Sequence, residues 1–266
     1  MTERTLTRRG FAAASAAFLS AGSALGAEPD IHLRVVGSGE RTWVLLHPFS
    51  ASGKLWEARA ASLAEKHGVT VLSPDLPSHG RSRIVDEWSY VDAGWAVHAA
   101  LGDRPAPEVV VGASSGGIVA LRLAAIYRCP VLAIGVGDAF SHANLETMRA
   151  FSQAPDTGND AFATAYREQG EAQRLAIRKH LGQLANSGTG PFLNPGETSN
   201  IGSKTVILNG SKDDFFSQAQ AHALADSIPG SALTFLTGAG HLDPLAGPWR
   251  DHTWSTVEAL AAHHRG

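Results

Sequence analysis

The sequence predicts an α/β fold with a mostly parallel β-sheet, helices on both faces and a small helical cap. Two patterns support this prediction. Short runs of β-branched and other apolar residues alternate along the chain with segments of helical periodicity. Several of these runs are apolar at nearly every position, as strands must be when helices cover both faces of a sheet. The alternation implies parallel strands joined by right-handed crossover connections.

The expected strands are these apolar runs, most of which end where glycine, proline or polar residues begin. In chain order they cover residues 31–36, 42–46, 70–73, 109–111, 131–134, 205–208 and 232–235. The expected helices are the longer periodic segments between them. In chain order they cover residues 54–66, 90–100, 115–127, 218–227 and 249–263.

One region interrupts the alternation. Residues 141–201 contain no convincing strand, and their pattern predicts helices over 144–152, 160–168 and 172–184, followed by a polar stretch rich in glycine, proline and asparagine. An insertion placed before the last two strands predicts a helical cap over one edge of the sheet. The core of the fold is then formed by residues 28–140 and 202–266.

The first 27 residues have a different composition. Basic residues are followed by a mildly apolar, Ala-rich stretch and then by a cluster of small residues, which is the layout of a cleavable export signal. Arg8 and Arg9 stand directly before the apolar part and resemble the twin-arginine motif. We therefore expect the twin-arginine export machinery as a partner and a periplasmic or secreted protein. The alternative is an amphipathic N-terminal helix packed on the domain.

Composition excludes several classes of function. The chain has 266 residues and a net charge of −3, so it has no basic excess for binding nucleic acid. Its single cysteine, Cys129, excludes an internal disulfide and a CxxC site. No apolar run approaches the length of about 20 residues that spans a bilayer, so we expect no stable membrane insertion after signal cleavage. The histidines show no metal-ligand spacing, and no metal or cofactor is expected.

The segment around Ser114 carries the candidate chemistry. It consists of a valine-rich strand, a tight turn with the pattern Gly112-x-Ser114-x-Gly116, and a helix. This arrangement exposes a serine hydroxyl on a strained elbow, where larger residues in place of the glycines would collide with the backbone. The helix that follows directs unpaired N–H groups toward developing negative charge.

A serine needs a base that is held by an acid before it becomes a good nucleophile. Asp213 follows the predicted strand at 205–208, and His241 follows the strand at 232–235 through a glycine turn. Each of these residues, like Ser114, falls just past the carboxyl end of a strand, where open α/β sheets place their sites. Asp214 is the competing acid.

In the order Ser114, Asp213, His241, the chain resembles the α/β-hydrolase family, in its esterase-like and lactonase-like serine hydrolase branch. Residues 44–50 resemble the family's oxyanion loop, and residues 73–82 resemble its Asp-x-Pro-Gly-His-Gly-x-Ser loop. Pro48 and Ser78 stand where glycine is usual.

The resemblance implies that the backbone N–H groups of Phe49 and Ser115 form the oxyanion hole. It also favours Asp213 over Asp214 as the acid, and it gives His79 and His47 structural roles in their loops.

The resemblance implies a serine hydrolase that cleaves a small-molecule carboxylic ester or lactone through an acyl-enzyme on Ser114. A perhydrolase, an acyltransferase or a C–C bond hydrolase could use the same residues, and a non-catalytic ligand receptor could retain the pocket. The aromatic residues of the insertion and of the loop after the acid are candidates for an apolar substrate pocket, although core packing is the alternative. The candidates are Phe140, Phe162, Tyr166 and Phe215.

Overall fold

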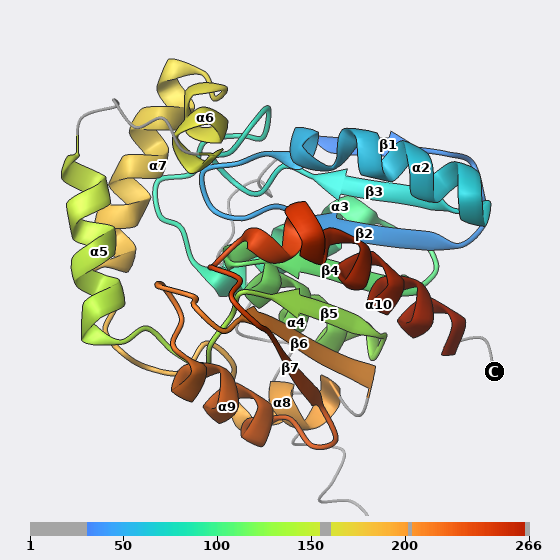
Figure 1. Cartoon of the computed structure of the whole chain (residues 1–266). Helices are drawn as coiled ribbons and strands as arrows, with labels where there is room; N and C mark the ends of the chain where they lie inside the picture. The colour runs from blue at the N-terminus through green and yellow to red at the C-terminus, as the bar shows by residue number, and fades with distance from the viewer. Residues whose placement is uncertain (1–30, 155–160, 202–203, 264–266) are drawn as a thin grey trace, which may run out of the picture.

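The computed structural model describes residues 31–154, 161–201 and 204–263. Its centre is a seven-stranded sheet in the order β1-β3-β2-β4-β5-β6-β7 (Figure 1). β1 pairs with β3 in antiparallel orientation, and the other neighbouring strands are parallel. The predicted fold class is confirmed. The strands are β1 (Leu33–Val36), β2 (Thr42–Leu46), β3 (Thr70–Pro74), β4 (Val109–Ala113), β5 (Val131–Ile134), β6 (Thr205–Gly210) and β7 (Ala232–Leu236).

Successive side chains of each strand enter different hydrophobic layers, because side chains alternate between the two faces of a sheet. In β2, Val44 and Leu46 belong to one layer, and Trp43 and Leu45 belong to the other. All four are fully buried. A strand covered on both faces therefore has to be apolar throughout, which explains the continuous apolar runs in the sequence.

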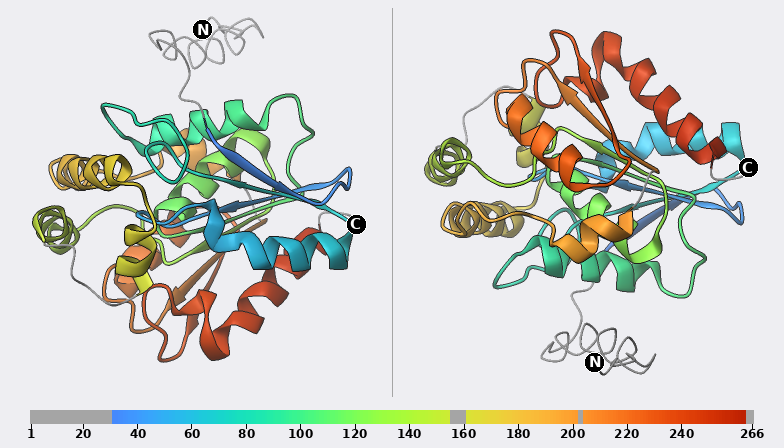
Figure 2. Two further views of the ribbon diagram at one scale, coloured as in Figure 1. Left: turned by 90° about the horizontal axis from the view of Figure 1, so that it is seen from above. Right: turned by 90° about the horizontal axis from the view of Figure 1, so that it is seen from below.

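Helices cover both layers (Figure 2). The layer that contains Trp43 also contains residues of α2 (Glu57–His67) and α10 (Arg250–His263). The layer that contains Val44 holds residues of α3 (Tyr90–Leu101), α4 (Ser115–Tyr127) and α9 (Gln218–Ser227). Short 3-10 turns are present at η2 (Gly53–Trp56), η4 (Asp243–Leu245) and η5 (Gly247–Trp249). Within the described ranges, no helix combines the length and apolarity that a bilayer crossing requires.

Three helices of the insertion lie beyond the ends toward which the strands point: α5 (His142–Gln153), α6 (Ala161–Arg167) and α7 (Glu171–Leu184) (Figure 1). α5 begins where Ser141 and Asn144 form a reciprocal capping box. α5 and α7 pack against each other. This part of the insertion is positioned to influence access to the carboxyl edge of the sheet.

The polar end of the insertion contains a helix that the sequence interpretation missed, α8 (Pro195–Ile201). Asn194 caps it, since its Oδ1 accepts from the N–H groups of Gly196 and Glu197, and Glu197 Oε2 accepts from Asn194 N–H in return. α8 packs against α4, where Glu197 pairs with Arg122. The last part of the insertion therefore joins a face of the sheet instead of extending over the strand ends.

Candidate active site

Ser114 occupies the turn between β4 and α4 in a strained conformation, with φ 50° and ψ −121°. Glycine is required at positions 112 and 116, because a larger side chain would collide with neighbouring backbone atoms. A Cβ on Gly112 would lie 2.1 Å from the carbonyl oxygen of Gly116, and a Cβ on Gly116 would lie 2.4 Å from that of His47. The N–H of Ser114 donates to the carbonyl oxygen of Ile134 at 2.7 Å, which fixes the turn against β5. The serine hydroxyl is thus held at the edge of the sheet by packing and backbone geometry.

Ser114, His241 and Asp213 form one hydrogen-bonded chain. His241 Nε2 lies 3.0 Å from Ser114 Oγ, and His241 Nδ1 lies 3.0 and 2.9 Å from the two carboxylate oxygens of Asp213. A carboxylate can only accept, so Nδ1 carries the proton and Nε2 is the atom left to accept from the serine hydroxyl. This is the arrangement in which an imidazole can remove a proton from a hydroxyl.

Asp213 is oriented by the turn in which it lies. Its Oδ1 also accepts from the N–H groups of Phe215 and Phe216, each at 2.8 Å, and its side chain is 1% exposed. Asp214, the neighbour that the sequence left as a competitor, is exposed. Gly210 allows the close approach of this turn to the His241 loop, because a Cβ there would lie 2.2 Å from the carbonyl oxygen of Ala239.

The backbone N–H groups of Phe49 and Ser115, in two different loops, are the predicted oxyanion donors. Within the part of the chain that the structure describes, neither Phe49 N–H nor Ser115 N–H has a hydrogen-bond acceptor. The orientation of the Phe49 N–H is fixed through the carbonyl of the same peptide group. Pro48 O accepts from His47 Nδ1 at 2.8 Å and from Ala51 N–H at 3.2 Å. Two donors on one carbonyl resist a flip of that peptide, so the N–H keeps its direction.

A family model described as the alpha/beta hydrolase family matches residues 43–252, which is most of the chain and includes Ser114, Asp213 and His241. The chain belongs to the alpha/beta hydrolase family.

Curated relatives match over a limited segment. Lipase LipV of Mycobacterium tuberculosis is 38% identical over 99 residues, which is 36% of this chain and 36% of the lipase. Protein phosphatase methylesterase 1 of Rattus norvegicus is 30% identical over 102 residues, which is 36% of this chain and 26% of the methylesterase. The match thus spans about a third or less of the length of these relatives.

Solved structures match over nearly the whole domain. A carboxylesterase structure from Nitrososphaera gargenis superposes with a TM-score of 0.71 at 19% identity, covering 88% of this chain and 95% of that one. The enol-lactonase of Burkholderia xenovorans LB400 gives a TM-score of 0.65 at 19% identity, covering 88% and 97%. At these identities the likeness establishes the shared fold.

His47, in the first loop, makes the hydrogen bonds of a neutral imidazole. His47 Nδ1 donates to Pro48 O, while its Nε2 accepts from the N–H of Leu76 at 2.9 Å. Complete burial lowers the pKa of His47 to about 4. The neutral ring therefore bridges the two loops that the family resemblance singled out, since Leu76 belongs to the second of them.

The second loop is organised around the buried carboxylate of Asp75. One of its oxygens accepts from Gly53 N–H and the other from Arg81 N–H, at 2.6 and 2.9 Å. Ser78, where the family usually has glycine, adopts the left-handed conformation with φ 66°. Its hydroxyl compensates for the strain, because Oγ accepts from Val85 N–H at 3.0 Å and lies 2.9 Å from His180 Nε2 of α7.

His79 lies in the same loop and has no hydrogen-bonded contact with the Ser114 group among the described residues. Its Nδ1 lies 2.9 Å from Pro77 O, and burial lowers its pKa to about 3. Its ring packs edge-on against Phe49, with centroids 4.7 Å apart. The structure thus gives His79 a packing role beside the oxyanion loop.

Aromatic side chains gather next to His241. The ring of Phe215 lies 5.3 Å from the imidazole, and Phe140 contacts Phe215 at 6.4 Å between centroids. Phe140 is buried and Phe215 is half-buried. Tyr166 is also buried, but its hydroxyl donates to Arg174 O and accepts from Arg178 Nε of α7. The side chain of Phe162, the fourth predicted pocket residue, lies outside the described residues.

The sequence analysis missed two residues that the structure brings to this region, Trp88 and Tyr90. Tyr90 OH lies 3.1 Å from Ser115 Oγ, in a buried setting. Burial raises the pKa of Tyr90, so its hydroxyl stays protonated. The ring of Tyr90 contacts Phe192 at 5.3 Å and Trp88 at 4.9 Å. No local motif marks Trp88 and Tyr90, because long-range folding brings Tyr90 beside Ser115 and Trp88 packs against Tyr90.

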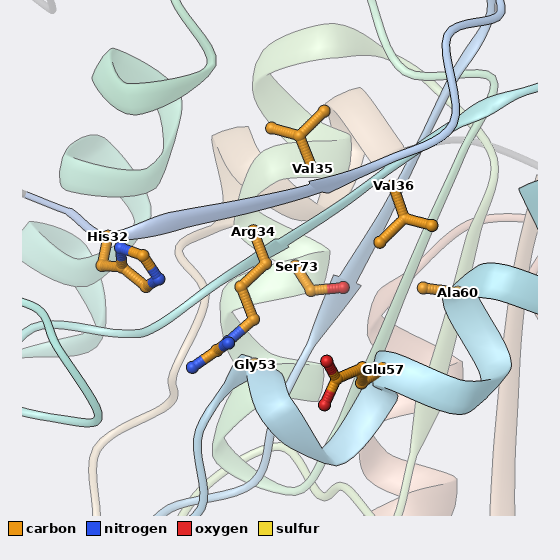
Figure 3. A pocket seen from close by; sticks show the side chains of 8 residues that line it. All are labelled: His32, Arg34, Val35, Val36, Gly53, Glu57, Ala60 and Ser73. Carbon is orange, nitrogen blue, oxygen red and sulfur yellow. The ribbon is translucent and has the colours of Figure 1, made fainter.

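A separate cavity of about 280 Å³ lies between β1, β3 and the η2–α2 segment (Figure 3). Figure 3 shows the side chains of Arg34, Ser73 and Glu57 around it. Its lining includes none of Ser114, Asp213 and His241. Within the described ranges, no cluster of three or more His, Cys, Asp or Glu side chains could hold a metal ion.

Proposed function

We propose that this protein is a serine hydrolase that cleaves a small carboxylic ester or lactone through an acyl-enzyme on Ser114. The observation that carries the proposal is the position of His241, with Nε2 3.0 Å from Ser114 Oγ and Nδ1 against the buried Asp213 carboxylate. An imidazole so placed accepts the serine proton as the hydroxyl attacks a carbonyl carbon.

The same groups serve both halves of the reaction. His241 accepts the proton of Ser114 and returns it to the leaving oxygen. In the second half it activates a water molecule that attacks the acyl-enzyme. Asp213 keeps the imidazole in the required tautomer and stabilises the imidazolium. The N–H groups of Phe49 and Ser115 are the proposed donors to the tetrahedral oxyanion, where removal of one donor typically costs about 3 kcal/mol.

The surroundings favour a small, mostly apolar acyl compound. Phe140, Phe215 and Tyr90 line the neighbourhood of His241 and Ser115 with aromatic surface. We propose that α5, α6 and α7 act as a cap over this surface, since they lie beyond the carboxyl ends of the strands (Figure 1). Similar proteins include a lipase, a carboxylesterase and an enol-lactonase, which supports ester or lactone chemistry.

A matched substrate panel tests the proposal. The measurement is kcat/KM on p-nitrophenyl esters of increasing chain length, simple lactones and an insoluble polyester. We expect turnover of the soluble substrates and little release from the polyester, because a cap excludes a polymer chain. Preference for the polyester would contradict the cap, whereas absence of turnover on every substrate would favour a non-catalytic receptor.

We also propose that residues 1–27 direct export through the twin-arginine machinery. The support is the sequence pattern of Arg8 and Arg9 before a weakly apolar stretch. These residues lie outside the described part of the structure. Substitution of both arginines by lysine should retain unprocessed precursor in the cytoplasm, as measured by fractionation and N-terminal sequencing. An extracytoplasmic protein that still begins at residue 1 or 2 would contradict signal cleavage.

A further inference from the structure

Gln169 lies in the turn between α6 and α7, yet this polar residue is only 5% exposed. All of its side-chain hydrogen-bonding groups are used. Its Oε1 accepts from Gly80 N–H at 2.6 Å, and its Nε2 donates to Ser50 O at 3.2 Å and to Ala165 O at 3.3 Å. A buried primary amide is kept in place when both its oxygen and its nitrogen are satisfied in this way.

The Ser50 contact reaches the loop that carries the proposed oxyanion donor. Ser50 directly follows Phe49, is fully buried, and adopts the left-handed conformation with φ 69°. Such a conformation is strained for a residue with a side chain and persists where the surroundings hold it. The hydrogen bond from Gln169 to Ser50 O restrains this strained residue from the side of the insertion.

The Gly80 contact reaches the loop built on Asp75. Gly80 has φ 55°, and a Cβ there would lie 2.2 Å from Asp75 Oδ2, so the backbone passes directly over the buried carboxylate. The amide of Gln169 therefore joins three segments that are distant in sequence: the α6–α7 turn, the Phe49–Ser50 backbone and the Asp75 loop.

We propose that Gln169 is a positioning residue that helps to hold the direction of the Phe49 N–H toward the substrate oxyanion, because Ser50 O belongs to the same peptide group as Ala51 N–H, which donates to Pro48 O. The proposal rests on the function proposed above, because it assigns a role within that reaction. Gln169 acts through Ser50 O and does not touch the reacting atoms. Through this hydrogen bond, the geometry of the oxyanion hole depends on the position of α6 and α7. The insertion therefore contributes to the chemical step as well as to substrate access.

The amide group is specifically suited to this position. Gly80 N–H requires an acceptor, whereas the carbonyl oxygens of Ser50 and Ala165 require a donor. Methionine, which has a similar length, supplies neither group well. A carboxylate supplies the acceptor for Gly80 but places negative charge against two carbonyl oxygens, and burial there raises the pKa of an introduced carboxyl above its ordinary value of about 4.3. Only its protonated form can donate to Ser50 O.

The test compares Gln169→Glu, Gln169→Met and the control Glu168→Gln on a soluble p-nitrophenyl ester between about pH 5 and 8.5. Glu168 is the exposed neighbour, and it pairs only with Lys54 through its carboxylate among the described contacts. Active sites are counted with a p-nitrophenyl phosphonate, so that loss of folded enzyme does not affect kcat. Misdirection of a catalytic donor should lower kcat at least about tenfold in Gln169→Met while KM changes less than about threefold.

In Gln169→Glu, kcat relative to wild type should fall as pH rises through the pKa of the introduced carboxyl, whereas the ratio for Gln169→Met should be independent of pH. The control should match wild type. A kcat within about twofold of wild type in Gln169→Met, or a flat ratio in Gln169→Glu, would overturn the inference. Ser114→Ala separates this failure from failure of the proposed function: an inactive Ser114→Ala with normal Gln169 variants rejects only the role of Gln169.

Discussion

Asp213 and Asp214 are neighbours with the same carboxylate, but the structure gives them different surroundings. Asp213 is buried against His241 Nδ1 and two backbone N–H groups, whereas Asp214 is exposed. Asp213→Asn preserves the size of the side chain but can stabilise the wrong imidazole tautomer, so kcat should fall by up to about 10⁴-fold. Asp214→Asn should change kcat less than about threefold. Steady-state kinetics of both variants provide the comparison, and the reverse ranking would assign the acid to Asp214.

At the residue scale, the sequence predicts those site residues that stand next to a recognisable turn or strand end. Ser114 stands between glycines at a strand–helix junction, and Asp213 and His241 follow strand ends. Gln169 could not be predicted in this way, because its partners Gly80 and Ser50 lie 89 and 119 residues away. Its burial results from tertiary folding, which no nearby pattern encodes.

At the scale of elements, Ser78 links the Asp75 loop to α7. Ser78→Ala removes the hydroxyl that serves Val85 N–H and His180 Nε2 but keeps a side chain at φ 66°. Buried groups left without partners should lower the free energy of unfolding by about 1–3 kcal/mol. Ser78→Gly loses the same hydroxyl but tolerates the positive φ, so it should be less destabilised than Ser78→Ala.

Urea unfolding of wild type, Ser78→Ala and Ser78→Gly measures these differences. Equal stability of all three proteins would show that the hydroxyl bridge between the loop and α7 contributes nothing.

The secondary structure was largely predictable because most elements are marked by continuous apolar runs or by helical periodicity. α8 was the exception, since Pro195 and Gly196 suggested an irregular stretch. A start signal was nevertheless present: asparagine at the cap, proline at the first helical position and glutamate at the third. The cap is formed by reciprocal bonds between Asn194 and Glu197. Packing on α4, which sequence alone does not show, supplies the rest of the stabilisation.

At the scale of the whole molecule, buried neutral histidines make stability depend on pH. Burial lowers the folded-state pKa of His47 to about 4 and of His79 to about 3, and it also lowers that of His180. The unfolded chain titrates these groups near 6.5, so between that pH and the folded pKa values it binds more protons than the folded protein. The free energy of unfolding must therefore decrease as pH falls below about 6.5.

Each such histidine can lower the folding equilibrium constant by up to about tenfold per pH unit in this window. Urea unfolding at intervals between pH 7 and 5 measures the slope, and His47→Asn should make it shallower. A free energy of unfolding that stays constant from pH 6.5 to 5 would contradict the assignment of neutral, buried imidazoles.

The topology explains why the candidate site forms where it does. β4, β6 and β7 are parallel members of one sheet, so the turns that carry Ser114, Asp213 and His241 emerge at the same edge. The mostly parallel sheet and the alternation of strands and helices could be anticipated from sequence. The contacts between the insertion and this edge could not be anticipated from sequence, because they depend on polar side chains from loops that are distant along the chain.

The account depends on Ser114 acting as the nucleophile, and the most direct test is the turnover of a soluble p-nitrophenyl ester by wild type and Ser114→Ala. Both proteins should show the same cooperative unfolding, because the alanine keeps the backbone of the turn. We expect kcat to fall by about 10⁴–10⁶-fold in the variant. If Ser114→Ala retains more than about a tenth of the wild-type kcat, the hydrogen-bonded chain of Ser114, His241 and Asp213 is not the reaction centre.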